Sequence, residues 1–404
     1  MPAAEPPFSA FEFARRLGLA REAMAARGLD AIFCEDPSNM AWLTGYDGWS
    51  FYVHQGVILT LDGDPIWWGR AQDAAGARRT VWMEDARVRF YAEHLVQNPD
   101  AHPMEDLAHL LSDLGLSRGR IGVELDNYYY SAKAHLTLVE GLPEAELVDA
   151  TGLVNRCRTV KSEEELVYMR RAARISERLV DLASARLEPG LAKNLLVADL
   201  MREAVRGDGE AWGDYAAIVP LLPSGEDAAA PHLTWDGRPF REGEATTLEL
   251  AGCHRRYHAP LCRTVFLGEP PVEMRRAEQA LLEGIEAGID AARPGNVAGD
   301  VARALNRALK RIGIEREPRC GYPIGLSYPP DWGERTISFR ASDETVLEPG
   351  MTFHFMPGLW MDGWGLAITE SIMIRMGGPA ECLAERPREM VVKGAAARAD
   401  GVAL

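Results

Sequence analysis

The segment RTVKSEEELVYMRRAARISERLVDLA, at residues 158 to 183, constrains the fold more than any other stretch of this chain. Ser162 precedes a long amphipathic pattern and Glu165 follows three residues later, which is the capping-box signal that starts a helix. Short strand and helix patterns lie before this helix, and a longer series of both follows it. We therefore expect an α/β protein of two domains, over residues 1–155 and 156–404.

The patterns on either side predict the individual elements. Residues 10 to 28 carry a helical pattern. Strands are predicted, the third and fourth as a hairpin around Asp62 and Gly63, for LDAIFCE, MAWLTGY (40–46), GVILTL, PIWWGR and RIGVELD (120–126). After the capped helix we expect two more helices, strands near 215 to 220, two helices between about 272 and 312, and a strand-rich C-terminal third.

Composition limits the classes of partner. The 60 acidic and 44 basic side chains leave a formal charge of −16, which disfavours nucleic acid or an anionic membrane and favours cationic or zwitterionic ligands. There is no secretory signal pattern and no apolar run long enough to span a bilayer, so we expect a cytoplasmic protein. The six cysteines contain no C-x-x-C pair, which argues against a disulfide framework or a zinc knuckle.

Several strings occur in an order known from one group of enzymes. They are SNMAWLTGY at 38–46, RTVKSEEEL at 158–166, PSGEDAAAPH ending at His232, YHAPLCRT ending at Thr264, GYPIG at 321–325 and PGMTFHFMPGLW at 349–360. With these strings the chain resembles the group of creatinase, aminopeptidase P and methionine aminopeptidase. The resemblance covers nearly the whole chain, and it implies a small α/β N-terminal domain followed by a catalytic domain with the pita-bread fold.

The same resemblance shows where this chain departs from the metal-dependent members, which bind two metal ions through two Asp, one His and two Glu. Here the five positions hold Glu249, Pro260, Tyr322, Met356 and either Thr369 or Glu370. The register at the last position is not fixed by one sequence. At most two carboxylates remain, too few for hard divalent ions, so we expect neither a metal nor any other cofactor.

Two interpretations fit a site that has lost its metal ligands. The chain is either a non-catalytic binding module on this fold or an enzyme whose pocket is rebuilt for metal-free chemistry, as in creatinase. The second is favoured because polar side chains persist on or beside the former ligand segments. These side chains are Glu249, His258, Tyr322, His354 and Glu370.

Two residues are predicted to be catalytic. Glu249 lies in the apolar run TTLEL, where burying an unpaired carboxylate is costly, so we expect it to face a pocket. His232 falls on the histidine that lines the pocket throughout the group and serves as the acid/base in creatinase. The predicted substrate-binding residues are Trp49, Tyr52, His258, Tyr322, His354 and Glu370.

Some of these residues have a plain structural alternative. His258 and His354 fit equally well as satisfied core histidines. Trp49 and Tyr52 belong to an aromatic-rich stretch that simple core packing would also explain. In this group, however, the N-terminal domain of one subunit can close over the partner's active site, and the resemblance therefore implies a homodimer with these aromatic residues as a substrate lid.

The missing metal indicates the kind of substrate. Peptide hydrolysis needs a polarised amide and an activated water, which a metal pair supplies. A guanidinium or amidinium carbon is already electrophilic, and a carboxylate such as Glu249 can pair with its N–H groups. Water, or Glu249 itself, would attack this carbon while His232 passes a proton to the departing nitrogen.

Three further strings resemble the ectoine hydrolase branch of the group. They are GWSFYVHQGV at 48–57, GLSYPPDWGERT at 325–336 and GWGLAITESI at 363–372. This resemblance implies hydrolysis of a C–N bond in a small zwitterionic cyclic amidine. Candidates for binding its carboxylate are His258, His354, Arg335 and Arg340. A creatinase-like enzyme, an X-Pro peptidase or a metal-dependent lyase of dimethylsulfoniopropionate remain as alternatives.

Overall fold

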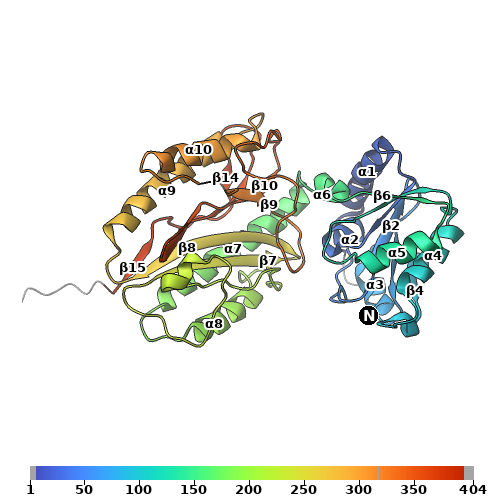
Figure 1. Cartoon of the computed structure of the whole chain (residues 1–404), viewed down its shortest axis with the longest axis horizontal. Helices are drawn as coiled ribbons and strands as arrows, with labels where there is room; N and C mark the ends of the chain where they lie inside the picture. Colours follow the sequence, from blue (N-terminus) through green and yellow to red (C-terminus); the bar gives the residue numbers. More distant parts are fainter. Residues whose placement is uncertain (1–5, 317, 395–404) are drawn as a thin grey trace, which may run out of the picture. The chain divides into compact units, whose positions relative to one another are not determined.

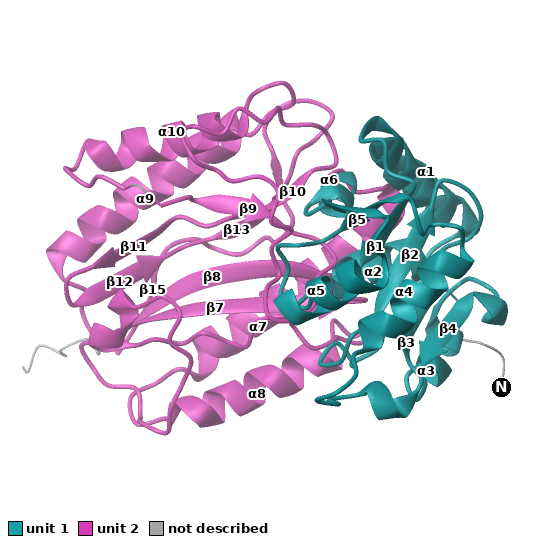
Figure 2. Cartoon of the chain, turned by 45° about the vertical axis from the view of Figure 1, so that its right-hand side comes forward, with its two compact units in different colours: residues 1–158 teal, residues 159–404 magenta. Residues whose placement is uncertain are grey.

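The computed structural model describes residues 6–316 and 318–394, and the chain divides into two compact units between Arg158 and Thr159 (Figure 2). This division falls a few residues beyond the boundary expected after residue 155. None of the described helices is both long and apolar enough to cross a lipid bilayer.

Unit 1 is built on a six-stranded mixed sheet with the strand order β4-β3-β2-β1-β5-β6. The strands are β1 (Ala31–Cys34), β2 (Gly56–Thr60), β3 (Ile66–Arg70), β4 (Val88–Tyr91), β5 (Arg120–Val123) and β6 (Glu146–Asp149). The helices are α1 (Ala10–Ala26), α2 (Pro37–Thr44), α3 (Ala74–Thr80), α4 (Pro103–Asp113), α5 (Ala132–Gly141) and α6 (Leu153–Cys157). Side chains alternate between two buried clusters, with Trp67 in one and Trp68 in the other, so both faces of the sheet are covered.

The prediction of a strand at residues 40–46 is wrong, because this stretch forms most of α2. The side chain of Asp36 accepts a hydrogen bond from the Ser38 N–H, and Pro37 lies in the first turn. Gly45 ends the helix with a left-handed φ of 78°. These start and stop signals outweigh the strand preference of the apolar run. The neighbouring hairpin prediction is confirmed, since β2 and β3 pair antiparallel across Gly63.

Unit 2 begins with the predicted helix, α7 (Glu163–Arg186). The Ser162 side chain accepts from the Glu165 N–H, and the Glu165 carboxylate accepts from the Ser162 N–H at 2.8 Å, so the capping box is confirmed. The long strands β7 (Ala245–His254) and β8 (Tyr257–Leu267) form an antiparallel hairpin, and α7 packs along both (Figure 1).

The region between α7 and this hairpin differs from the prediction. It contains one α-helix, α8 (Lys193–Arg206), and a short 3-10 helix, η3 (Gly225–Ala229), within the described residues. No strand forms at 215–220 in the described chain, so the second helix and these strands were wrongly predicted. The backbone instead meets β7 at two isolated bridges, Leu221 with Glu249 and Ser224 with Thr246.

The C-terminal third is rich in strands, as predicted. The helices α9 (Val272–Ala291) and α10 (Ala298–Lys310) precede it. A four-stranded antiparallel sheet in the order β14-β13-β10-β9 contains β9 (Gly321–Pro323), β10 (Thr352–Phe355), β13 (Glu370–Met373) and β14 (Glu381–Cys382). The remaining strands are β11 (Gly358–Met361) and β12 (Trp364–Ala367), which pair together, and β15 (Val391–Lys393), which joins β8 in parallel.

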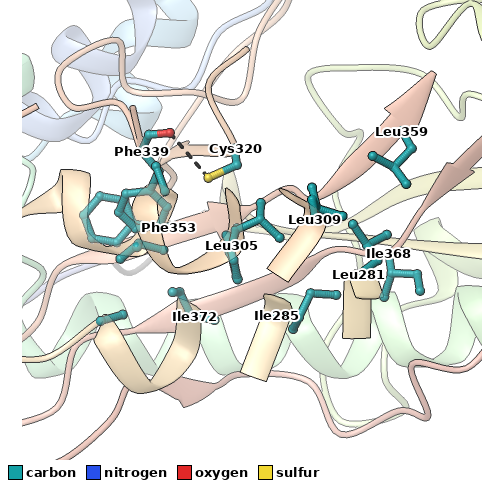
Figure 3. Packing of buried hydrophobic residues seen from close by; sticks show 14 of the residues in the cluster. Leu281, Ile285, Leu305, Leu309, Cys320, Phe339, Phe353, Leu359, Ile368 and Ile372 are labelled. Carbon is teal, nitrogen blue, oxygen red and sulfur yellow. Dashed lines mark hydrogen bonds between the residues drawn. The ribbon is translucent and has the colours of Figure 1, made fainter. Parts of the chain in front are cut away.

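A buried apolar cluster fixes this sheet against the two helices. Leu281 and Ile285 of α9 and Leu305 and Leu309 of α10 pack in one cluster with Phe353 of β10 (Figure 3). Each such side chain stabilises the fold by roughly 1.5–3 kcal/mol when fully buried. The cluster therefore holds β10, and with it the paired strand β9, in a fixed position.

A buried ion pair ties the entrance of unit 2 to a distant loop. Lys161 Nζ donates to the Glu334 carboxylate at 2.7 Å, and both side chains are about 1% exposed. Their attraction offsets the cost of desolvation only while both partners are present. The pair anchors the loop at residues 325–336, which carries Trp332.

We expect Lys161→Met to lower the free energy of unfolding of unit 2 by about 3–5 kcal/mol, because it leaves the Glu334 carboxylate buried without its cation. The double variant Lys161→Met with Glu334→Leu should recover most of this loss, since it buries no charge. Urea denaturation followed by tryptophan fluorescence measures both. A single variant as stable as the parent would show that the pair does not stabilise the entrance.

Candidate active site

A cavity of about 640 Å³ lies in unit 2, a volume within the range of small-molecule sites. Its wall is formed by β7, by the loop before β7, by the segment that leads into β9, and by the ends of β9 to β11. The polar side chains in its lining are His232, Thr234, Glu249, Arg316, Arg319, Tyr322 and Asp331. Apolar side chains, Leu221, Met356 and Trp360 among them, complete it.

Glu249 is held firmly by its backbone, while its carboxylate has no hydrogen-bonding partner among the residues that the structure describes. It pairs with Cys262 of β8 on one side, and on the other it exchanges two hydrogen bonds of 3.1 Å with the backbone of Leu221. No described residue gives its carboxylate a hydrogen bond or an ion pair. Burial raises the pKa of Glu249 to about 7. Such a group is stabilised by whatever supplies a proton or a cation.

His232 lines the same cavity, but it is exposed and lies in a loop rather than on a strand. It lies in the exposed loop that follows η3, and its imidazole contacts no described hydrogen-bonding partner. The structure therefore brings the two predicted catalytic residues to one cavity. Glu249 is fixed on a strand, whereas His232 belongs to a loop.

Three of the former ligand positions lie on the hairpin face of Glu249 or line the same cavity. Pro260 pairs with Ala251 on the hairpin and Cys262 with Glu249, so Pro260 and Glu249 lie on one face of it. Tyr322 and Met356 line the cavity beside Glu249.

This donor set does not fit a dinuclear metal centre. A phenol, a thioether and a proline ring stand where two carboxylates and an imidazole would be needed. Nowhere in residues 6–316 and 318–394 do three or more His, Cys, Asp or Glu side chains meet in a way that could hold an ion.

Tyr322 is joined to a buried chain of polar groups. In the register of β9 and β10 it lies opposite His354, whose Nδ1 is 3.0 Å from the Tyr322 oxygen. His354 Nε2 is 2.8 Å from Thr369 Oγ1, and Trp332 Nε1–H donates to the Tyr322 oxygen at 2.8 Å. Burial lowers the pKa of His354 to about 3 and raises the pKa of Tyr322 well above its usual value. Both side chains are thus neutral at neutral pH.

The other predicted binding residues have partners within the protein. His258 Nε2 accepts a hydrogen bond of 2.9 Å from the Ala217 N–H, and burial lowers the pKa of His258 to about 3. Glu370 forms ion pairs with Arg263 at 2.8 Å and with Arg388 at 2.9 Å. Over the described residues, the cavity lining does not include His258, His354 or Glu370.

Trp49 and Tyr52 lie on the surface of unit 1. Their exposed fractions are 57% and 66%, so they are not core residues. Trp49 packs against Phe51 with ring centroids 4.8 Å apart. Their role as a lid stays a prediction.

Sequence reasoning missed Arg319. It lines the cavity with its guanidinium carbon 4.6 Å from the centroid of the Tyr322 ring, and it forms no hydrogen bond or ion pair with any described residue. The two arginines named from the sequence, Arg335 and Arg340, are exposed, and within the described chain neither belongs to the lining. Arg319 lies in an irregular segment without periodicity, and its only sequence signal was its closeness to the GYPIG string.

Comparison with known proteins identifies the family. Residues 167–376 match the model of metallopeptidase family M24, and residues 16–160 match that of the creatinase/prolidase N-terminal domain. The chain belongs to family M24. It is 56% identical, over 96% of its length and 98% of the relative's, to a protein of Halomonas elongata named ectoine hydrolase. This M24 chain is therefore a hydrolase, and its predicted likeness to the ectoine hydrolase branch is confirmed.

Solved M24-like structures share the fold. Dipeptidase PepE from Mycobacterium ulcerans superposes with a TM-score of 0.78 at 24% identity, covering 96% of this chain and 99% of its own. A prolidase from Thermococcus sibiricus gives a TM-score of 0.82 at 16% identity, covering 95% and 100%. The predicted fold class, a small α/β domain followed by a pita-bread catalytic domain, is confirmed.

The raised pKa of Glu249 predicts a pH-dependent cost in stability. Since burial raises its pKa from the ordinary 4.5 to about 7, the folded protein binds the proton more tightly and loses stability as the pH rises through this window. The Gln side chain of Glu249→Gln does not titrate. We therefore expect the unfolding free energy of the variant to rise relative to that of the parent between pH 4.5 and 7, and the difference to stay constant above pH 7. Urea denaturation across pH, with the exposed Glu242→Gln as control, tests this; a pH-independent difference would contradict the raised pKa.

Proposed function

We propose that this hydrolase opens the cyclic amidine ring of ectoine, and of its hydroxylated relative, to an N-acetylated diaminobutyrate without a metal ion. The observation that carries the proposal is the unpaired Glu249 carboxylate in a cavity whose former ligand positions hold Pro260, Tyr322 and Met356. The likeness to the Halomonas elongata protein named ectoine hydrolase supports the choice of substrate.

The environment of Glu249 favours a cationic substrate. An unpaired carboxylate with a pKa of about 7 exchanges its proton for an amidinium cation at little cost. An N–H group of the amidinium donates a charge-assisted hydrogen bond to the carboxylate. Glu249 thereby holds the electrophilic carbon at a fixed strand position.

The bond-breaking step follows from the two residues that share the cavity. An oxygen atom adds to the amidinium carbon, either from water that Glu249 deprotonates or from the Glu249 carboxylate itself, in which case water later hydrolyses the bond to Glu249. His232 then gives a proton to one ring nitrogen as its bond to this carbon breaks. The exposed loop position of His232 allows it to exchange this proton with solvent.

The wider setting forms part of the proposal. We propose an enzyme without metal or other cofactor that acts in the cytoplasm on a small zwitterion, with neither nucleic acid nor membrane as a partner. We further propose a homodimer in which the N-terminal domain lies near the partner's active site. Trp49 and Tyr52 would then cover the flat amidinium, a contact that contributes about 0.5–2 kcal/mol and excludes water.

The decisive experiment follows ectoine by proton NMR in the presence of the purified protein. We expect ring opening to the N-acetylated acid, unchanged by EDTA, together with no cleavage of creatine or an X-Pro dipeptide. Treatment with EDTA followed by added zinc or manganese serves as the control. Activity that is lost to EDTA and restored by metal would refute the metal-free mechanism, and cleavage of another substrate alone would refute the choice of ectoine.

Two substitutions test the catalytic roles. Glu249→Gln and His232→Ala should each reduce turnover of ectoine by roughly a hundredfold or more while the protein stays folded. For the parent, kcat/KM should rise with pH through about 7 as Glu249 ionises, and this step should vanish in Glu249→Gln. The exposed residues Glu242 and His109 supply the matched controls Glu242→Gln and His109→Ala. Near-normal turnover in either site variant would disprove the role of that residue.

A further inference from the structure

We propose that Arg319 and the Tyr322 hydroxyl group bind the carboxylate of the substrate, and that Thr369 and His354 hold this hydroxyl group as a hydrogen-bond donor. The identity of the substrate rests on the function proposed above. The direction of the hydrogen bonds does not, because it follows from buried groups of the protein alone.

Arg319 supplies the positive charge of this subsite. Its guanidinium lies over the Tyr322 ring, and no described residue accepts its hydrogen bonds. Its neighbour Arg316 differs, since it donates to the backbone oxygens of Gly358 at 2.9 Å and Pro318 at 3.1 Å. Arg319 therefore keeps its donors for a ligand in the cavity, and a guanidinium binds a carboxylate through two parallel hydrogen bonds.

The donor and the acceptor in each hydrogen bond between Thr369, His354 and Tyr322 can be assigned, starting from Thr369. The Cys262 N–H donates to Thr369 Oγ1 at 2.7 Å, so this oxygen already acts as an acceptor. Among the described residues, the only acceptor for the Thr369 hydroxyl proton is His354 Nε2, at 2.8 Å. Thr369 is 1% exposed, so a proton without an acceptor would be buried at a cost. Thr369 therefore donates to His354 Nε2, which carries no proton.

The position of the proton on His354 then follows. A neutral imidazole has one N–H, and with Nε2 bare it lies on Nδ1. Nδ1–H donates to the Tyr322 oxygen at 3.0 Å, and Trp332 Nε1–H donates to the same oxygen at 2.8 Å. The opposite tautomer would leave the buried Thr369 proton without a described acceptor.

The hydroxyl proton of Tyr322 is therefore still free to donate a hydrogen bond. Its oxygen accepts two hydrogen bonds, and no described residue accepts its own proton. Tyr322 lines the cavity, so this proton is available to a ligand there. Hydrogen bonds that polarise one another along a chain strengthen the last donor.

The guanidinium of Arg319 and the hydroxyl group of Tyr322 can bind the same group of a ligand. Arg319 and Tyr322 contact each other, and both present only donors to the cavity, which selects an anion. Glu249, whose charge acts on the Tyr322 hydroxyl group, presents only acceptors to the same cavity. A zwitterion with a carboxylate at one end and a cation at the other matches both.

Nitrogen-15 NMR of histidine-labelled protein tests the relay without any substrate. His354→Gln identifies the signals of His354 among those of nine histidines. We expect the neutral Nδ1–H tautomer at neutral pH in the parent and in Thr369→Ser. In Thr369→Val we expect a shift toward the Nε2–H tautomer, because the donor to Nε2 is gone. An Nε2–H tautomer in the parent would overturn the relay, whatever the enzyme hydrolyses.

Calorimetry tests the carboxylate subsite with two ligands, ectoine and the cyclic amidine that lacks its carboxylate. Arg319→Met and Tyr322→Phe should each weaken the binding of ectoine roughly 10- to 100-fold and leave the binding of the other ligand unchanged. Thr369→Val should weaken the binding of ectoine by a smaller factor, whereas Thr369→Ser should bind ectoine as tightly as the parent does. Equal weakening of both ligands would overturn the subsite. Failure of the parent to bind ectoine would instead refute the function proposed above, while the tautomer result would stand.

Discussion

The antiparallel ladder between β7 and β8 is the constraint on which the catalytic unit depends. It runs from the pair Ala245 and Phe266 to the pair His254 and Tyr257, and every pair fixes the face on which its side chains lie. A slip of one residue would turn Glu249 from the cavity into the packing against α7. The segment at Thr369 and Glu370, which holds the last former ligand position, is bonded to this ladder. The Thr369 N–H donates to the backbone oxygen of Cys262, the residue that pairs with Glu249.

The electrostatic character of the cavity depends on the charged side chains that are not neutralised near it. Burial keeps His258 and His354 uncharged, and two arginines neutralise Glu370. Among the described residues, neither Glu249 nor Arg319 forms an ion pair, and they have opposite signs. A site of this kind discriminates by charge separation rather than by hydrophobic area, which suits a small and very polar ligand.

The sequence predicted best the features that depend on local signals. The capping box at Ser162 and the helices α9 and α10 are set by neighbouring residues, and a pattern shows them. The stretch at 40–46 failed because an apolar run in a buried helix has no visible periodicity, while the N-cap, Asp36, lies before the run. Glu249 was predictable as a carboxylate in an apolar strand. Arg319 was not, because its irregular segment has no pattern that indicates where its side chain lies, and the tautomer of His354 depends on contacts between residues far apart in sequence.

The strand β15 has a consequence for how the protein is made. It covers the edge of β8 at Val265 to Leu267, and Lys393 Nζ donates to the backbone oxygens of Ser184 and Ala185 near the end of α7. Until residues 391–393 have been synthesised, the sheet that carries Glu249 has an open edge, and open strand edges pair readily with other chains. The emerging polypeptide thus exposes an edge of its own catalytic sheet, and β15 covers that edge once it has been synthesised.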